Sequence, residues 1–217
     1  MTHSVQARTN MIEGQLRPNQ ITDQKVIDAI ASVNREKFVP RSLAGVAYLD
    51  EDIPVGEGRY LMEPMVFARL VEAAHVRPTD LVLDIACGTG YSSAVLGRLA
   101  EAVVALEENE KLATQATELL SEEACDNVAV VNGPLKEGLA AQGPFDVIFI
   151  NGMVDEVPQN ILEQLTDDGR VICVLNENGV GKACILTYKE KIPGKQVLFD
   201  AAVPKLKAFA KDPGFVF

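Results

Sequence analysis

The sequence predicts an α/β protein built on a doubly wound, seven-stranded, mostly parallel sheet of the Rossmann-like type. Two observations lead to this prediction. An apolar run at residues 81–84 ends on a carboxylate, and a turn of small residues and an apolar-periodic helix from Tyr91 follow it. Beyond that motif, strand-like and helical runs alternate until a terminal β-hairpin, which predicts a sheet with one reversed strand.

The N-terminal part is expected to be a helical extension that precedes the sheet. Residues 1–20 lack periodicity and contain Arg17-Pro18-Asn19, a turn signal, so they predict an extended arm. Thr22 is a typical N-cap for the amphipathic helix that follows. Residues 47–64 predict a loop, and Pro64 suits the first turn of a helix that reaches about residue 75.

The elements after the central helix are expected in regular alternation. The remaining predicted strands are residues 102–106, 127–131, 147–150, 170–175, 182–189 and 196–199. The predicted helices are residues 109–120 and 157–165, and the predicted turns are residues 167–169 and 179–181. The tail at residues 212–217 is expected to pack its aromatic side chains against the body.

Length and composition are those of one globular domain. The chain has 217 residues, of which 47% are hydrophobic and 24% charged. We therefore expect a single domain at residues 1–217, with an N-terminal arm, helices and substrate loop at 1–78 and a sheet core at 79–217. Neither a signal peptide nor an apolar run of membrane-spanning length is evident, which predicts a cytoplasmic location.

The net charge and the positions of the cysteines and histidines disfavour several kinds of partner and site. The formal net charge of −11 disfavours nucleic acid as a partner, and it disfavours anionic membranes for the same reason. The cysteines, Cys87, Cys125, Cys173 and Cys184, have no metal-ligand spacing, and the histidines, His3 and His75, stand far apart. We therefore expect reduced thiols and no metal site.

The glycine turn indicates which cofactor the sheet would bind. A dinucleotide fingerprint requires a third glycine, and Ser93 stands at that position. The pattern that fits is acidic-x-small-x-Gly-x-Gly, the motif of S-adenosylmethionine (SAM) methyltransferases. A carboxylate beside the turn suits a cationic ligand that carries no phosphate. The alternative is an ordinary glycine-rich turn. The cofactor-binding residues expected here are Asp84, Ala86, Cys87, Gly88, Gly90 and Tyr91.

A second carboxylate follows the next predicted strand. Glu107 comes 23 residues after Asp84, close to the spacing of about 20 at which an acidic residue meets a ribose in dinucleotide folds. Vicinal hydroxyls require a carboxylate acceptor, so the same geometry serves the ribose of SAM. Glu108 is the alternative contact.

Several short motifs across nearly the whole chain resemble the protein-L-isoaspartate O-methyltransferase family. They include Arg35-x-x-Phe38-Val39-Pro40, Ile53-Pro54-Val55-Gly56-x-Gly58, the turn around Asp84, Val104-x-Leu106-Glu107, Pro144-Phe145-Asp146 and Glu156-Val157-Pro158. The resemblance implies a class I SAM methyltransferase fold. It also implies transfer of the SAM methyl group to the side-chain carboxylate of isoaspartate in damaged proteins, the first step of their repair.

The sequence departs from the family pattern where substrate and adenine are handled. The family continues its glycine pair with Gln-Thr-Ile-Ser, whereas this chain has Arg59-Tyr60-Leu61-Met62, so Met62 stands at the position of the family's serine. A thioether donates no hydrogen bond. The family's adenine-reading aspartate is matched by Pro134, followed by Leu135, and Asn151 replaces a threonine at the end of the fourth strand. Pro134, Leu135 and Asn151 complete the expected cofactor site.

Three hypotheses follow for the acceptor. In the first, the chain is a carboxyl methyltransferase of the isoaspartate type, in which Arg59 orients the carboxylate and Tyr60 adds a donor. In the second, SAM is retained and the apolar residues around Met62 suit a small-molecule acceptor, such as a small carboxylate. In the third, the fold binds SAM or a partner without catalysis. A monomer or weak homodimer is expected in each case.

Overall fold

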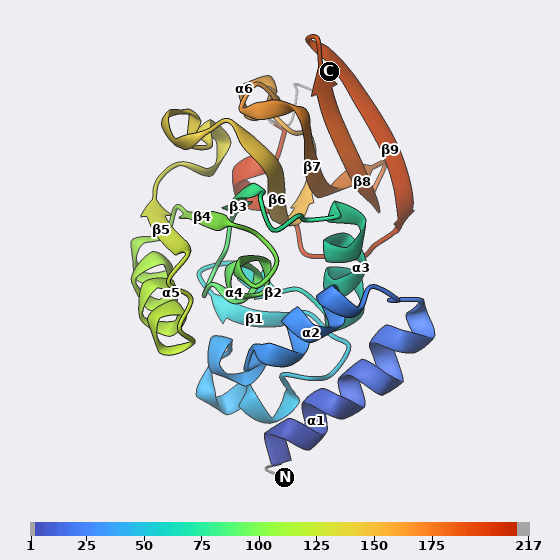
Figure 1. Cartoon of the computed structure of the whole chain (residues 1–217), viewed down its shortest axis with the longest axis vertical. Helices are drawn as coiled ribbons and strands as arrows, with labels where there is room; N and C mark the ends of the chain where they lie inside the picture. Colours follow the sequence, from blue (N-terminus) through green and yellow to red (C-terminus); the bar gives the residue numbers. More distant parts are fainter. Residues whose placement is uncertain (1–2, 212–217) are drawn as a thin grey trace, which may run out of the picture.

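The structure is a computed structural model that describes residues 3–211. Its main sheet has seven strands in the order β5-β4-β3-β6-β7-β8-β9 (Figure 1). The first five strands run parallel, β8 is antiparallel to both of its neighbours, and the predicted mostly parallel sheet with a C-terminal hairpin is confirmed. The strands are β3 Leu81–Ile85, β4 Ala102–Glu107, β5 Val128–Asn132, β6 Phe145–Val154, β7 Leu165–Glu177, β8 Val180–Lys189 and β9 Ile192–Asp200.

The central strands β3, β4 and β6 are buried on both faces, which explains their continuous apolar runs. Along β3, Val82 belongs to one hydrophobic cluster and Leu83 to another, because successive side chains of a strand point to opposite faces. In β6, Phe149 and Ile148 divide in the same way. The helices of the α/β core are α3 Pro64–Ala74, α4 Tyr91–Gly97, α5 Glu110–Glu122 and α6 Gln159–Leu162.

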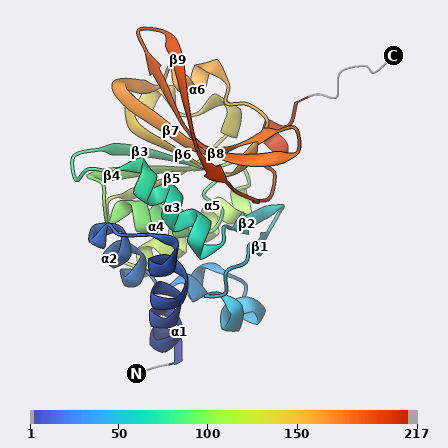
Figure 2. The same cartoon turned by 90° about the vertical axis from the view of Figure 1, so that its right-hand side faces the viewer.

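The N-terminal residues are helical, so the predicted extended arm is wrong. The helix α1 His3–Met11 continues as a π-helical turn, Ile12–Leu16, and a 3-10 turn, Arg17–Asn19. Met11 and Leu16 are fully buried, and this tertiary packing stabilises a helix whose sequence has no amphipathic period. The N-terminal helices lie at the end of the molecule opposite β8 and β9 (Figures 1 and 2).

The amphipathic helix after the first turn is present as α2 Gln24–Ser32. Its N-cap is Asp23, whose carboxylate accepts a hydrogen bond from the backbone N–H of Lys25, rather than the predicted Thr22. The backbone N–H of Thr22 donates instead to Glu72 of α3. Two 3-10 helices, Arg35–Phe38 and Arg41–Val46, then lead toward the sheet.

Residues 47–64 contain a hairpin that the loop prediction missed. Strands β1 Ile53–Gly56 and β2 Arg59–Leu61 pair antiparallel around a turn at Glu57 and Gly58, which have φ values of 52° and 75°. Such positive φ values are typical of two-residue hairpin turns. The side chains of β2 alternate between buried and exposed, and this alternation positions the residues of the site described below.

The C-terminal half differs from the expectation in three details. Residues 167–169 lie inside β7 rather than in a turn, and α6 has four residues rather than nine. The β7–β8 turn is Asn178-Gly179, one residue before the predicted turn, with both residues at positive φ. Three 3-10 helices, Leu135–Glu137, Ala140–Gln142 and Lys207–Phe209, complete the fold. The predicted docking of residues 212–217 lies outside the described residues.

Candidate active site

The candidate site lies at the carboxyl ends of β3, β4 and β6, the edge of the sheet where doubly wound folds bind ligands. The turn after β3 has three positive φ values, at Ala86 (60°), Gly88 (57°) and Gly90 (95°). A Cβ on Gly90 would come within 3.2 Å of Leu120 on α5, so only glycine suits this position. The backbone N–H of Ala86 donates to the carbonyl of Leu106, which ties the turn to β4.

Asp84 is fully buried at the end of β3 and accepts three side-chain hydrogen bonds. The hydroxyls of Ser92 and Ser93 on α4 donate to one oxygen, at 2.7 and 2.5 Å, and the amide of Asn151 donates to the other at 2.6 Å. Burial raises the pKa of Asp84 to about 6, although these donors act in the opposite direction. Asp84 therefore couples the start of α4 to the end of β6.

Glu107 is also fully buried, and protein donors use both of its oxygens. Arg59 binds it in a two-point contact, Nε to Oε2 at 3.1 Å and Nη2 to Oε1 at 3.0 Å. The backbone N–H groups of Gly88 and Asn109 each donate to one oxygen at 3.0 Å. A carboxylate offers about four acceptor positions, so the residue expected to bind a ribose diol is saturated by its own chain.

Arg59 reaches this carboxylate from the hairpin. Its side chain is only 6% exposed, and its Nη2 also donates to the more exposed Glu108 at 2.7 Å. Burial alone lowers the pKa of Arg59, but the charge of Glu107 and the hydrogen bonds outweigh it, so that the pKa lies above its ordinary value. Arg59 therefore contacts Glu107 and Glu108, and it lines neither of the two small cavities that Tyr60 and Met62 share.

Tyr60, Met62 and Asn151 lie close together beside the glycine turn. Tyr60 is 44% exposed, whereas Met62 is 6% exposed and packs in the core. Two small cavities, each about 10 Å³, adjoin these residues. One of them is closed from the other side by the segment at residues 203–206, which hydrogen-bonds to Met153 at the end of β6.

The other residues expected at the site are placed as follows. Pro134 is exposed after β5 and Leu135 is buried, while Gly133 donates to the backbone carbonyl of Glu107. Tyr91 is buried against Phe38 and Phe67. Burial raises the pKa of the Cys87 thiol well above its ordinary value, so Cys87 is an inert packing residue.

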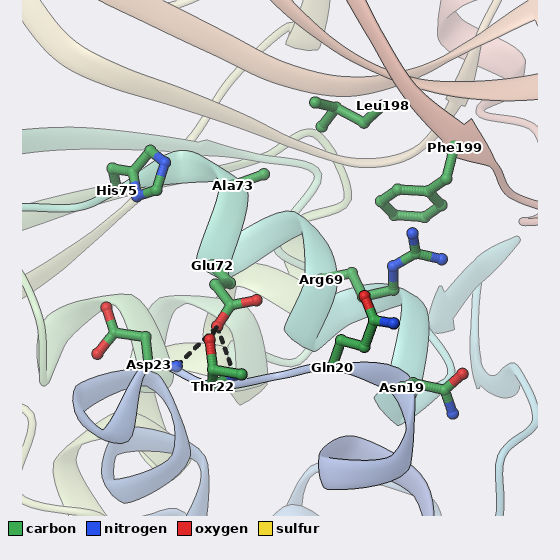
Figure 3. A pocket seen from close by; sticks show the side chains of 10 residues that line it. All are labelled: Asn19, Gln20, Thr22, Asp23, Arg69, Glu72, Ala73, His75, Leu198 and Phe199. Carbon is green, nitrogen blue, oxygen red and sulfur yellow. Dashed lines mark hydrogen bonds between the residues drawn. The ribbon is translucent and has the colours of Figure 1, made fainter.

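A larger cavity lies elsewhere. It has a volume of about 500 Å³ and lies between the loop at residues 19–23, α3 and β9 (Figure 3). There the guanidinium of Arg69 stacks on Phe199, 3.6 Å from the ring centroid. This groove shares no lining residue with the glycine turn, so we assign the site by the buried carboxylates and not by volume.

Comparison with known proteins identifies the family. A family model described as protein-L-isoaspartate(D-aspartate) O-methyltransferase matches residues 6–199. The chain belongs to this family. A protein-L-isoaspartate O-methyltransferase of Koribacter versatilis is 39% identical over 165 residues, which cover 76% of this chain and 74% of that protein. One from Roseiflexus castenholzii is 40% identical over 152 residues, 70% of each chain.

Solved structures agree with the family assignment. A protein-L-isoaspartate O-methyltransferase superimposes with a TM-score of 0.79 at 25% identity, over 92% of this chain and 65% of that one. A putative enzyme of the same name from Plasmodium falciparum, in complex with S-adenosyl-L-homocysteine, superimposes with a TM-score of 0.78 over 96% of this chain and all of that one. At 20% identity the second comparison supports the fold alone. Both agree with the predicted class I methyltransferase fold.

The family's cofactor matches the chemistry of the site but not the space within it. Asp84 and Glu107 are buried carboxylates at adjacent strand ends, which suits a ligand with an ammonium group and a ribose diol. Ligand pockets typically enclose about 300–1,000 Å³, whereas the cavity beside the glycine turn has about 10 Å³. The residues therefore fit the chemistry of SAM, while the enclosed space beside the turn is smaller than a typical ligand pocket.

Three partners of the site carboxylates were not identified from the sequence. Ser92 and Ser93, which hold Asp84, are eight and nine residues further along, and one turn of helix brings both hydroxyls back to the strand end. The ion pair of Arg59 with Glu107 joins residues 48 apart, and no local pattern indicates it.

Within residues 3–211, no cluster of three or more His, Cys, Asp or Glu side chains could hold a metal ion, and no helix has the length and apolarity to span a membrane.

Proposed function

We propose that this chain is a SAM-dependent O-methyltransferase that transfers a methyl group to the carboxylate of isoaspartyl residues in proteins or peptides. The observation that carries the proposal is membership of the isoaspartate methyltransferase family together with two buried carboxylates at the ends of β3 and β4. The 39% identity to a named relative over three quarters of both chains supports the same activity. The coverage of the family model, residues 6–199, includes every residue of the proposed site.

The roles of the residues follow from their positions. Glu107 would accept hydrogen bonds from the ribose hydroxyls, and Asp84 would attract the ammonium group at short range. The hydrogen bonds from Ser92, Ser93 and Asn151 would fix the orientation of the Asp84 carboxylate. When bound, SAM supplies an electrophilic methyl group. Gly88 and Gly90 allow the turn its positive φ values and allow Arg59 and Leu120 to pack closely against it.

The acceptor needs no general base from the protein. A side-chain carboxylate is ionised at pH 7, so the protein has only to position it and exclude water. Tyr60, half-exposed on the outer face of β2, would donate its hydroxyl to the acceptor, and Asn151 borders the same cavity. Met62 has no donor to offer, so the positioning of the carboxylate depends on these neighbours.

The decisive experiment is a methyl-transfer assay with labelled SAM on an isoaspartyl peptide and on its normal aspartyl counterpart. Base-labile label on the isoaspartyl peptide alone is the expected result. Equal labelling of both peptides would contradict isoaspartate specificity. Absence of label on both, with labelling of a small carboxylic acid offered in parallel, would replace the proposed acceptor and keep the methyltransferase chemistry.

A further inference from the structure

We infer that Arg59 is a latch residue that competes with the nucleoside of SAM for Glu107, so that cofactor binding requires Arg59 to leave this carboxylate. The inference rests on the proposed function, because SAM is the ligand that would displace the arginine. The juxtaposition of a buried arginine on the β1–β2 hairpin with the carboxylate at the end of β4 is its basis.

The first argument is the saturation of Glu107. Each of its oxygens receives one N–H from Arg59 and one backbone N–H, from Gly88 or Asn109, all between 3.0 and 3.1 Å. A ribose diol would need acceptor positions on the same carboxylate. The two backbone donors are part of the turn and of the start of α5, whereas Arg59 is a flexible side chain. Arg59 is therefore the donor that gives way.

The second argument is the position of the arginine over the glycine turn. A Cβ built on Gly88 would meet the Cβ of Arg59 at 3.7 Å, so the base of the arginine covers the glycine that would admit a ligand. The guanidinium continues from there to Glu107, and the side chain of Arg59 is only 6% exposed. Departure of the side chain from Glu107 would free two acceptor positions on this carboxylate and uncover Gly88.

The third argument is that Arg59 has a second carboxylate within reach. Its Nη2 also donates to Glu108 at 2.7 Å, and the side chain of Glu108 is 39% exposed, whereas that of Glu107 is fully buried. A guanidinium that leaves Glu107 therefore retains an ion pair at the rim of the site. Glu108 thus gives the open state a partner, and the hairpin backbone need not separate from the core.

The latch makes a quantitative prediction for cofactor affinity. A ligand that binds only the open state has an apparent dissociation constant raised by the inverse of the open fraction. Replacing Arg59 by an uncharged residue removes the competitor, and a closed state favoured by about ten to one would then give about tenfold tighter binding. The wild-type protein should also show an association rate that saturates with cofactor concentration, because opening becomes rate-limiting.

The test is calorimetric titration of SAM and of S-adenosylhomocysteine into the wild type and into Arg59→Gln. Arg41→Gln is the matched control, because Arg41 is an exposed arginine on a 3-10 helix outside the site and the change in charge is the same. Binding about tenfold tighter in Arg59→Gln, with wild-type affinity in Arg41→Gln, supports the latch. Equal or weaker binding in Arg59→Gln overturns it.

Stopped-flow binding to the unmodified protein guards against a poorly folded variant. A rate that rises and then saturates with SAM concentration supports the latch, and a rate that stays linear to high concentration contradicts it. The methyl-transfer assay separates the two proposals. Tighter binding in Arg59→Gln with no methylation of an isoaspartyl peptide by any variant overturns the function alone. Methylation with equal binding overturns the latch alone.

Discussion

Asn151 donates its amide to the carboxylate of Asp84 at 2.6 Å and so joins the end of β6 to the end of β3. The same amide also donates to the backbone carbonyl of Ile85 at 3.2 Å. Among residues 3–211, the side chains that donate to Asp84 are all neutral, and no cation lies within hydrogen-bond distance of its carboxylate. A buried carboxylate of this kind is free to act on a cationic ligand.

The protonation of Asp84 should control cofactor affinity. Burial raises its pKa to about 6, so the carboxylate is charged at pH 8 and largely protonated at pH 5. We expect SAM to bind up to about tenfold more weakly at pH 5 than at pH 8, since about one molecule in ten then carries the charge. Calorimetric titration at both pH values measures this, and Asp84→Asn should be insensitive to pH. Equal wild-type affinity at both values would contradict the role of Asp84.

Glu63 should make the fold less stable as pH rises. Burial and the charges of Asp50 and Asp52 raise its pKa to about 7 from an ordinary 4.5. Between these values the folded chain holds a proton that the unfolded chain has lost, so the free energy of unfolding falls as pH rises through that window and levels off above it. Glu63→Gln should therefore stabilise the protein at pH 8 and have little effect at pH 4.5.

Urea unfolding at the two pH values tests the effect of Glu63. Glu118→Gln is a suitable control, because Glu118 is an exposed glutamate on α5 and the substitution removes the same charge. A stabilisation of equal size at both pH values, or in both variants, would show that Glu63 is not the titrating group.

Arg35 is buried in the core and connects the two segments that flank the β1–β2 hairpin. It is 1% exposed and donates to the backbone carbonyls of Ala47 and Met62, and its guanidinium lies 4.8 Å from the ring centroid of Tyr91. Arg35→Met should lower the free energy of unfolding by about 2–4 kcal/mol, because it leaves two buried carbonyls without donors. Arg35→Lys retains one donor and should lose less. Denaturant unfolding measures both, and equal losses would argue against the carbonyl contacts.

Met62 stands at the position of the family's serine, and it packs in the core but offers no hydrogen-bond donor. Met62→Ser should lower the free energy of unfolding by about 2–4 kcal/mol, because the thioether is buried in the hydrophobic core. The same variant should raise turnover of an isoaspartyl peptide, since a hydroxyl then faces the acceptor cavity. Met65→Ser, on α3 and outside that cavity, is the control. Lower turnover in Met62→Ser than in Met65→Ser would contradict the assignment.

The core of the fold was predictable because its signals are local. The run at residues 81–84 and the small residues after it predict a strand, a turn and a helix, and β6 is apolar enough to indicate burial on both faces. The N-terminal helix was not predictable from periodicity, since the burial of Met11 and Leu16 depends on the rest of the chain. Both hairpins have local turn residues, Gly58 after β1 and Asn178-Gly179 after β7. The loop predicted at residues 47–64 overlooks the first of these turns.

The site was predictable in position but not in state. The spacing from Asp84 to Glu107 locates two carboxylates at neighbouring strand ends, and the structure pairs these residues' strands in parallel register. The hydrogen-bond partners of the carboxylates could not be predicted, because Arg59 contacts Glu107 only when the hairpin is folded against the sheet. The same long-range contact pairs Arg59 with Glu107, and its predicted role in orienting the acceptor carboxylate stays a prediction.

The alternation along β2 sends neighbouring side chains of one three-residue strand to opposite faces of the hairpin. Arg59 and Leu61 point inward and Tyr60 points outward. Insertion or deletion of a single residue in the hairpin would exchange these sides, placing an aromatic ring over the glycine turn and an arginine at the surface. The length of this strand is therefore what lets Arg59 reach Glu107 while the ring of Tyr60 stays at the surface.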